Sequence, residues 1–567
     1  MEPLTADSAS DPRGVTTPLD PDRVEKTLRR LGLLDRWAHV VQGLRSGFHT
    51  GVNTDVPKTT IFENHTSSEL DPSFIDSYIA QEQAAGRYSQ GFEPSILEEL
   101  IGPFRTSPIG LVPKSGSSKL RMIQDLSFPR NDPTTSSVNS HVVSDDFPTA
   151  WGTFSKLSTL ILELPQGCQA TVFDISSAYR ITPVLPTQQH VLCVFWRGKV
   201  YVDRAVCFGL RSSAGVFGAI ADMIVDICEA SGFGPIKKWV DDFIVIWLPH
   251  QTWTETEFVQ LMAALGVPWS MEKTKPLADI QRYLGFNWNL SDKSVAFPVE
   301  KLDDLQALLL HWFDTSARFT SQEASRLHGK LVHATTIFPI IRPFLRSIAR
   351  FALKFQSPRA RLRSTDSVRA DVKWIADMLH KTPNTLPLTQ PTPVDLQWWG
   401  DASTSFGIGV TVGPAWEIWE WSPGFHVGPS LEYDIGWAEA VAIELGLQLA
   451  VVTHQIGTHS AGQVFLVRSD NEGVVTVLNK GRSWSRQTNT VLKRIYMMLA
   501  TLGVQLRAVH VRSDENITDP LSRGDIPAFL SQVPQDATRK RHSLPLPHSL
   551  SNALRSWSSP QPQSGSI

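Results

Sequence analysis

The chain has 567 residues, enough for several domains, and its formal charge is −3 from 53 basic and 56 acidic side chains. This balance excludes a protein that binds nucleic acid through a global positive field, so any such surface must be local. The four cysteines, Cys168, Cys193, Cys207 and Cys228, are spaced too widely for a zinc pattern or a disulfide framework, and we read them as reduced core thiols. We expect no signal peptide in the polar, acidic N-terminus. No apolar run reaches the roughly 18 residues of a membrane span, so we expect an intracellular protein of the cytoplasm or nucleus, without a membrane partner.

The first half of the chain is predicted to begin with a polar segment and then to mix strands and helices. We expect residues 1–30 to be disordered and residues 31–100 to form short helices and loops. From residue 101 to 300 strand patterns alternate with helices, and "VLCVFWRGKVYV" predicts a hairpin that turns at Arg197 and Gly198.

The second half is predicted to be helical first and then α/β. Residues 301–380 carry helical periodicity, and residues 381–394 form a linker rich in Pro and Thr, which we expect to act as a joint between separately folded regions. A second α/β region covers 395–525. The Ser/Pro-rich tail, 526–567, is expected to be disordered.

Three aspartates of the first region are candidate metal ligands. Asp241 and Asp242 are adjacent in "KKWVDDFIVIW", between two short apolar strands, and Asp174 ends the apolar strand of "ATVFDISSAY". Adjacent carboxylates repel each other, and their burial is costly unless a cation offsets the charge. Three carboxylates on neighbouring strand ends are a ligand set for two Mg²⁺ ions roughly 3.5–4 Å apart, which serve in-line attack on a phosphate. An aspartate pair alone is more often a solvated turn.

Other residues of this region are candidates for nucleotide binding. Lys119 and Arg121, in "SSKLRMIQDLSF", could neutralise a triphosphate, although Lys119 alone suggests a solvated edge strand. Tyr179 could pack under a sugar and exclude a 2′-hydroxyl, or be ordinary core. Gly209 lies in "CFGLRSSAGVF", a loop of small residues before a helix, which either allows close backbone approach to a nucleotide or is a plain turn.

The second α/β region has its own spaced carboxylates. Asp401 ends the strand of "LQWWGDAS", Asp470 ends that of "VFLVRSDNEGVV", and Asp519 follows the last strand, in "ITDPLSRG". A long helix between them carries Glu439 and Glu444, which are five residues apart and do not closely share a face. Four spaced acids alone would usually be surface residues.

The order and spacing of the motifs in the first region resemble the reverse transcriptase family. "FDISSAYR", "CFGLRSSAGVF" and "WVDDFIV" resemble its first three palm motifs, "LGVPWSMEKTKP" the fourth with its lysine, and "YLGFNWN" the primer-grip hairpin. More narrowly, "SPIGLVPKSGSSKLRMIQDLSFP" and "LHGKLVHATTIFPIIRPFLRSIAR" resemble retrotransposons of the DIRS class, which use a tyrosine recombinase. The resemblance covers about residues 40–525.

The resemblance implies a fold and a set of roles. The fold would be an α+β right-hand polymerase, with fingers and palm at 101–300 and a helical thumb or connection at 301–380, followed by an α/β ribonuclease H-like domain. The metal-holding residues would be Asp174, Asp241 and Asp242, and the nucleotide-binding residues would be Lys119, Arg121, Tyr179 as sugar gate, Gly209, and Lys273 near the leaving pyrophosphate.

Two positions depart from the family pattern. Gly215 stands where close relatives usually have a proline, which could alter template grip and fidelity. Ser177 stands where the family often has an acidic or polar residue. Neither departure removes a metal ligand.

The second region resembles the ribonuclease H fold in its order of three strands, a helix, a strand, helices, a strand and a helix. The resemblance makes Asp401, Glu439, Asp470 and Asp519 catalytic metal ligands, and the pattern "IGWAEA" favours Glu439 over a solvated or edge-packed Glu444. His510 lies near this site, but a lone histidine is more often structural.

The predicted function is RNA-directed DNA synthesis with cleavage of RNA in hybrids, using two Mg²⁺ or Mn²⁺ ions per site. The partners would be an RNA template, a DNA primer, an RNA–DNA hybrid and dNTPs. The sequence holds no zinc knuckle and no integrase-like His/Cys cluster, so a separately encoded recombinase is expected to integrate the product. The alternatives are a catalytically decayed or domesticated copy that binds nucleic acid, and a pararetrovirus-type polymerase.

Overall fold

The structure is a computed structural model, and it describes residues 11–113, 119–130, 132, 135–357, 359–389, 391–532 and 539–558. The chain divides into two compact units, Met1–Ser294 and Val295–Ile567, which we call unit 1 and unit 2. The boundary falls in strand β11 (Ser294–Ala296) and not at the linker 381–394, so the expectation that this linker is the joint is wrong. The reason is that the helices before the linker pack onto the α/β region after it and belong to the same unit.

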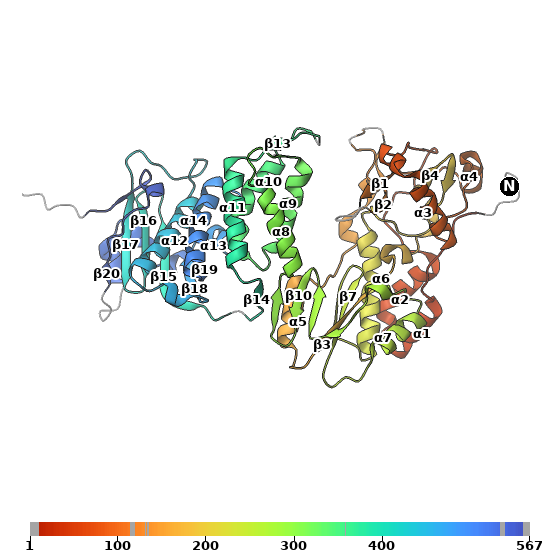
Figure 1. Ribbon diagram of the computed structural model, residues 1–567, viewed down its shortest axis with the longest axis horizontal. Coiled ribbons are helices and arrows are strands. Elements are labelled where there is room, and N and C mark those ends of the chain that lie inside the picture. The colour runs from red at the N-terminus through yellow and green to blue at the C-terminus, as the bar shows by residue number, and fades with distance from the viewer. Residues whose placement is uncertain are drawn as a thin grey trace, which may run out of the picture. The chain divides into compact units, whose positions relative to one another are not determined.

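The elements of unit 1 alternate as predicted between residues 101 and 294 (Figure 1). Its α-helices are α1 (Pro21–Arg30), α2 (Leu34–Ser46), α3 (Pro72–Ala84), α4 (Pro94–Ile101), α5 (Phe154–Glu163), α6 (Ser213–Ala230) and α7 (Glu255–Ala264). Its strands before β11 are β1 (Ile109–Pro113), β2 (Leu120–Gln124), β3 (Gln169–Asp174), β4 (Val194–Trp196), β5 (Lys199–Tyr201), β6 (Ile236–Trp239), β7 (Asp242–Trp247), β8 (Lys275–Ala278), β9 (Ile280–Tyr283) and β10 (Phe286–Asn289).

A four-stranded antiparallel sheet of order β6-β7-β3-β8 positions the first group of carboxylates. Its central strand β3 is buried along almost its whole length, because its apolar residues face packed layers. Phe173 and Phe243, a directly paired couple on β3 and β7, join the buried residues of α6, such as Phe217, in one core. This packing holds the ends of β3 and β7 in fixed register.

Hairpins complete unit 1. β1 pairs with β2, β9 pairs with β10, and β4 pairs with β5. The β4–β5 turn contains Arg197 and Gly198, both with positive φ, as the sequence predicts.

The N-terminal segment is not disordered throughout, contrary to expectation. Within 1–30, α1 begins after Asp20, whose side chain accepts hydrogen bonds from the next turn, and its Val24 and Leu28 are fully buried. The Asp20 backbone N–H also donates to the Leu265 carbonyl at 3.0 Å. Apolar burial against α6 and α7 outweighs the polar composition that suggested disorder.

Unit 2 begins with helices and continues as an α/β region. Its α-helices are α8 (Val299–His311), α9 (Ser321–Ala334), α10 (Leu345–Ala352), α11 (Asp366–Lys381), α12 (Ile435–Val452), α13 (Glu472–Lys480), α14 (Arg486–Leu502), α15 (Asp519–Ser522) and α16 (Ile526–Ser531). Its strands after β11 are β12 (Arg318–Phe319), β13 (Leu362–Arg363), β14 (Thr385–Pro387), β15 (Val394–Ala402), β16 (Gly407–Val412), β17 (Ala415–Trp421), β18 (Val464–Ser469), β19 (Gln505–His510), β20 (Lys540–Arg541) and β21 (Leu554–Ser556).

The main sheet of unit 2 has the order β19-β18-β15-β16-β17, with β20 and β21 both paired to β17. β15, β16 and β17 are antiparallel, whereas β18 and β19 run parallel to β15. Helix α12 packs on β15 and β16 and is buried along most of its length. It is the helix among the described residues that is long and apolar enough to cross a membrane, and it serves here as a core helix.

The tail is structured where it is described, so the expected disorder of 526–567 is wrong there. It contains the helix α16 and the strands β20 and β21, and the two strands extend the sheet at β17. Arg541 donates from Nε to Glu417 Oε1 at 2.8 Å, and Leu550 and Leu554 are buried in the core of the unit. These few buried residues are too widely spaced to give a periodic pattern in the sequence.

Candidate active sites

The first candidate site lies at one end of strands β3 and β7. Asp174 is the last residue of β3 and pairs directly with Asp242, the first residue of β7. Asp241 lies in the turn between β6 and β7, and its carbonyl accepts a hydrogen bond from the Ile175 N–H at 2.9 Å. The turn places Val240 at a φ of 54°, a left-handed conformation that a β-branched residue rarely adopts. The structure therefore brings the three predicted aspartates to one sheet end.

The charges at this sheet end repel each other. Burial, and then the charges of Asp241 and Asp174, raise the pKa of Asp242 from its ordinary value to about 6. Burial and the Asp174 charge also raise the pKa of Asp241. A divalent cation would offset this repulsion, but the oxygens of the three aspartates do not all lie within 4.8 Å of one another.

Lys273 lies within this group rather than apart from it. Its Nζ donates to Asp174 Oδ1 at 2.7 Å, and the same bond raises the pKa of Lys273. The sequence expectation placed this lysine near the leaving pyrophosphate; the structure places it on a carboxylate of the site.

The predicted cations lie on the β1–β2 hairpin. Arg121, on β2, is exposed and places its guanidinium 5.6 Å from the ring centre of Phe208. Its positive charge also reaches Asp241, whose pKa it lowers in opposition to burial. Lys119 is exposed and directly precedes β2.

Tyr179 lies beside the aspartates, half-buried between two phenylalanines. Its ring centre is 5.1 Å from that of Phe208 and 5.7 Å from that of Phe217. Burial and the charge of Asp241 raise the pKa of the Tyr179 hydroxyl. The ring is thus only partly buried, and it lies near enough to Asp241 to be affected by its charge.

Gly209 makes a close backbone contact within the protein itself, and its expected approach to a nucleotide stays a prediction. Its φ is +103°, and a Cβ there would lie 2.8 Å from the Gln124 carbonyl oxygen. Asn139 fixes the loop, because its Nδ2 donates to the Gly209 carbonyl at 2.8 Å and its Oδ1 accepts from the Arg211 N–H at 2.8 Å. The sequence reading missed Asn139, since an asparagine 70 residues away carries no local signal.

Gly215 has a physical explanation that the sequence did not offer. A Cβ on this residue would lie 2.3 Å from the carbonyl oxygen of Phe147 and 2.5 Å from its Cβ. The backbone of residue 147 therefore occupies the space that any side chain, including a proline ring, would need. The departure from the family pattern is matched by local packing.

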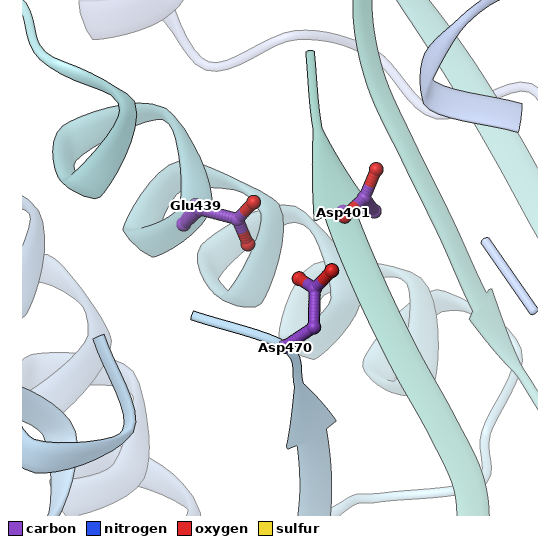
Figure 2. Close-up of side chains that lie close together, drawn as sticks. All are labelled: Asp401, Glu439 and Asp470. Carbon is purple, nitrogen blue, oxygen red and sulfur yellow. The ribbon is translucent and has the colours of Figure 1, made fainter. Parts of the chain in front are cut away.

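The second candidate site gathers Asp401, Glu439 and Asp470 (Figure 2). Asp401 lies on β15, Glu439 on α12, and Asp470 directly after β18, and their side chains point toward one another. One oxygen of each carboxylate lies within 4.8 Å of the others. Within the described part of the chain, this is the group of acidic, histidine or cysteine side chains compact enough to hold a metal ion.

Burial and mutual repulsion shape the electrostatics of this group. Burial, and then the charges of Asp470 and Asp519, raise the pKa of Asp401 to about 7. Burial, and then the charges of Asp401 and Asp470, raise the pKa of Glu439 well above its ordinary range. Asn516 donates from Nδ2 to Asp401 Oδ1 at 2.9 Å, a contact that sequence reasoning missed. A divalent cation would relieve the repulsion, so the donor set fits a metal ion.

The other candidate residues of this region each contact a different group. Asp519 lies near enough to raise the pKa of Asp401, but its carboxylate is held by Arg523 at 2.8–3.0 Å and stays outside the compact group. Glu444 is buried and accepts two bonds of 2.6 Å from Arg494, so it is packed and ion-paired rather than solvated. His510 Nε2 lies 3.1 Å from the Asp470 carbonyl oxygen.

Comparisons with known proteins give a likeness at the level of structure alone. No family model matches the chain, and no curated protein matches its sequence. Among similar solved structures, the foamy viral protease-reverse transcriptase in complex with an RNA/DNA hybrid has 17% identity and a TM-score of 0.45, over 96% of this chain and 67% of that one. A dRH form of the same viral protein with double-stranded DNA has 17% identity and a TM-score of 0.44, over 88% of this chain and 80% of that one. At these low scores and identities the likeness assigns no function to the chain.

Proposed function

We propose that this chain is the RNA-directed DNA polymerase of a retroelement, of a DIRS-like type, and that unit 2 cleaves the RNA of RNA–DNA hybrids. The observation that carries the proposal is the placement of Asp174 opposite Asp242, with Asp241 in the adjoining turn. A second acidic group, in unit 2, supports a second phosphodiester reaction.

In unit 1, Asp174, Asp241 and Asp242 would hold two Mg²⁺ ions. Bound there, the ions would supply a Lewis acid and an activated primer 3′-hydroxyl for attack on the α-phosphate of a dNTP. Arg121 would neutralise the triphosphate, and Tyr179 would face the sugar. Lys273 would exchange its bond to Asp174 for the phosphates of the substrate and would stand ready to donate a proton to the leaving pyrophosphate.

In unit 2, Asp401, Glu439, Asp470 and Asp519 would hold the ions, with water in place of the primer hydroxyl. Asp519 would join once Arg523 turns to a phosphate of the hybrid, since that arginine now holds its carboxylate. Asn516 would orient Asp401 through their hydrogen bond. Both sites would read the heteroduplex through its shape, phosphates and 2′-hydroxyls rather than through its base sequence.

The proposal is tested with the full chain, Mg²⁺ and dNTPs on an RNA template annealed to a DNA primer. Template-dependent extension that EDTA abolishes is expected. Intact binding of the template-primer without any extension, with Mg²⁺ and with Mn²⁺, would instead indicate a decayed copy.

A further inference from the structure

A basic cavity of about 420 Å³ lies in unit 2. The residues that line it are different from those of the two carboxylate groups. Five cationic side chains line it: Arg346, Arg350, Lys354, Arg486 and Lys493. Among the residues that the structure describes, no acidic one is part of the lining. Helices α10 and α11 form part of its wall and α14 forms another part, so the cavity is built within a single compact unit.

The cations are arranged by helical spacing. Arg346 and Arg350 are four residues apart on α10, and Arg486 and Lys493 are seven apart on α14, so each pair shares one helix face. Like charges four residues apart, such as Arg346 and Arg350, destabilise a helix, and an anion between them would offset the repulsion. The α10 face is therefore costly in the absence of a ligand.

The partners of these cations leave most of the positive charge unopposed. Lys493 is paired with Asp371, at 2.7 and 2.6 Å. Arg350, Lys354 and Arg486 have no ion-pair partner within the described part of the chain. Arg346 donates to the Ser483 carbonyl through one guanidinium nitrogen, while its buried Nε has no hydrogen-bond partner there. Burial and the charge of Arg350 lower the pKa of Arg346.

Neutral donors and a helix end complete the wall. Thr365, the N-cap of the 16-residue helix α11, and Ser367, in its first turn, both line the cavity. The N-terminus of a helix carries a partial positive charge and favours anions. Arginine forks, hydroxyl groups and a helix N-terminus together are the donors that phosphate prefers.

An exposed aromatic side chain lies next to this wall in sequence. Trp484 is 95% exposed, which is unusual for so large an apolar ring. It stands between Ser483, which accepts the hydrogen bond from Arg346, and Ser485, the N-cap of α14. Cations that track a backbone beside a free aromatic face are the combination that binds single-stranded nucleic acid.

We infer that this cavity binds backbone phosphates of single-stranded nucleic acid and that Trp484 stacks on an adjacent base. The site is separate from the two carboxylate groups. The inference rests on the proposed function only because nucleic acid is the ligand in both.

The test is binding of a labelled oligothymidylate to the full chain in EDTA, followed by fluorescence anisotropy over a series of salt concentrations. Arg350→Gln with Arg486→Gln should reduce the slope of log affinity against log salt by about 1.4, because each lost phosphate contact on a single strand contributes about 0.7. Trp484→Ala should weaken binding by about fivefold or more, as expected from loss of one stacked base. Arg23→Gln with Arg29→Gln, on the exposed face of α1, removes the same charge and should leave the slope unchanged.

The outcomes separate this inference from the proposed function. An unchanged slope in the Arg350/Arg486 variant, with an unchanged melting temperature, overturns the inference even if the chain extends primers. A reduced slope supports it even if no polymerase activity is found. If tripolyphosphate competes with the oligonucleotide while Trp484→Ala has no effect, the cavity takes free polyphosphate and the nucleic-acid assignment is wrong.

Discussion

Asp174 and Asp242 are direct partners across the antiparallel strands β3 and β7, so their carboxylates project from the same end of one sheet. Asp241 adds a third charge from the turn, and Lys273 neutralises part of the group through Asp174. Strand pairing thus places repelling charges together, an arrangement that costs stability and that a divalent cation would offset.

The first prediction concerns the balance between function and stability at Asp241. Asp241→Asn removes a charge whose pKa is raised by burial and by Asp174, so it should leave the melting temperature in EDTA unchanged or higher. Primer extension should fall by about a hundredfold or more, as expected when charge stabilisation of a phosphoryl transfer is lost. Asp279→Asn, at an exposed carboxylate of the same unit, is the control and should retain activity.

The second prediction concerns selection of the sugar. Tyr179→Ala should increase ribonucleotide incorporation relative to deoxyribonucleotide incorporation, because exclusion acts by a clash with the wrong substrate. Tyr179→Phe keeps the ring between Phe208 and Phe217 and should preserve the selectivity. Equal ratios in all three proteins, measured in single-nucleotide extension, would make Tyr179 a packing residue only.

The third prediction follows from the tight contact at Gly215. Gly215→Ala should lower the free energy of unfolding by about 1–3 kcal/mol, because the added Cβ would overlap the Phe147 backbone. Gly218→Ala, one turn later on the same helix, meets only the Trp151 ring at 3.4 Å and should be neutral or stabilising by up to about 1 kcal/mol. Urea unfolding of both variants checks this, and equal stabilities would show that the two backbones separate easily.

The fourth prediction concerns pH and metal at Asp401. The folded state raises the pKa of this carboxyl from 3.8 to about 7, so it favours the protonated form. The resulting stability is fully present below about pH 4 and is lost as the pH rises through about 7. In EDTA, the melting temperature of Asp401→Asn relative to the unaltered chain should therefore increase across this window.

Mg²⁺ supplies the complementary measurement at Asp401. Above pH 7 the ion should raise the melting temperature of the unaltered chain more than that of Asp401→Asn, since binding to the folded state stabilises it. A relative melting temperature that is constant with pH, together with an equal response to Mg²⁺, would show that the three carboxylates do not act as a metal site.

The sequence predicted the elements better than the contacts between them. Apolar runs with an aspartate at or near one end were enough to predict β3, β7 and β15, because burial and strand propensity act locally. The bond between Lys273 and Asp174 joins residues 99 positions apart and depends on the path of the whole chain. Asn139 and Asn516 escaped notice for the same reason.

Composition does not predict the order at the ends of the chain, because that order depends on tertiary packing. Val24 and Leu28 bury completely within a segment that is otherwise polar. Strands β20 and β21 have two and three residues, too few for any periodic pattern, and they are held by pairing with β17. Linker composition does not reveal the boundary at Ser294, because unit 2 is held together by tertiary contacts such as the Asp371–Lys493 ion pair between α11 and α14.

Both proposed reactions can be followed on one hybrid, with an RNA template labelled at one end and a DNA primer labelled at the other. With Mg²⁺ and dNTPs, the unaltered chain should lengthen the primer and shorten the RNA. Asp241→Asn should abolish extension and keep cleavage, and Asp470→Asn should do the reverse, because carboxylates of different groups share no ion. Loss of both activities in either folded variant, or extension by the unaltered chain with an intact RNA, would contradict the assignment of two separate reactions to these two sites.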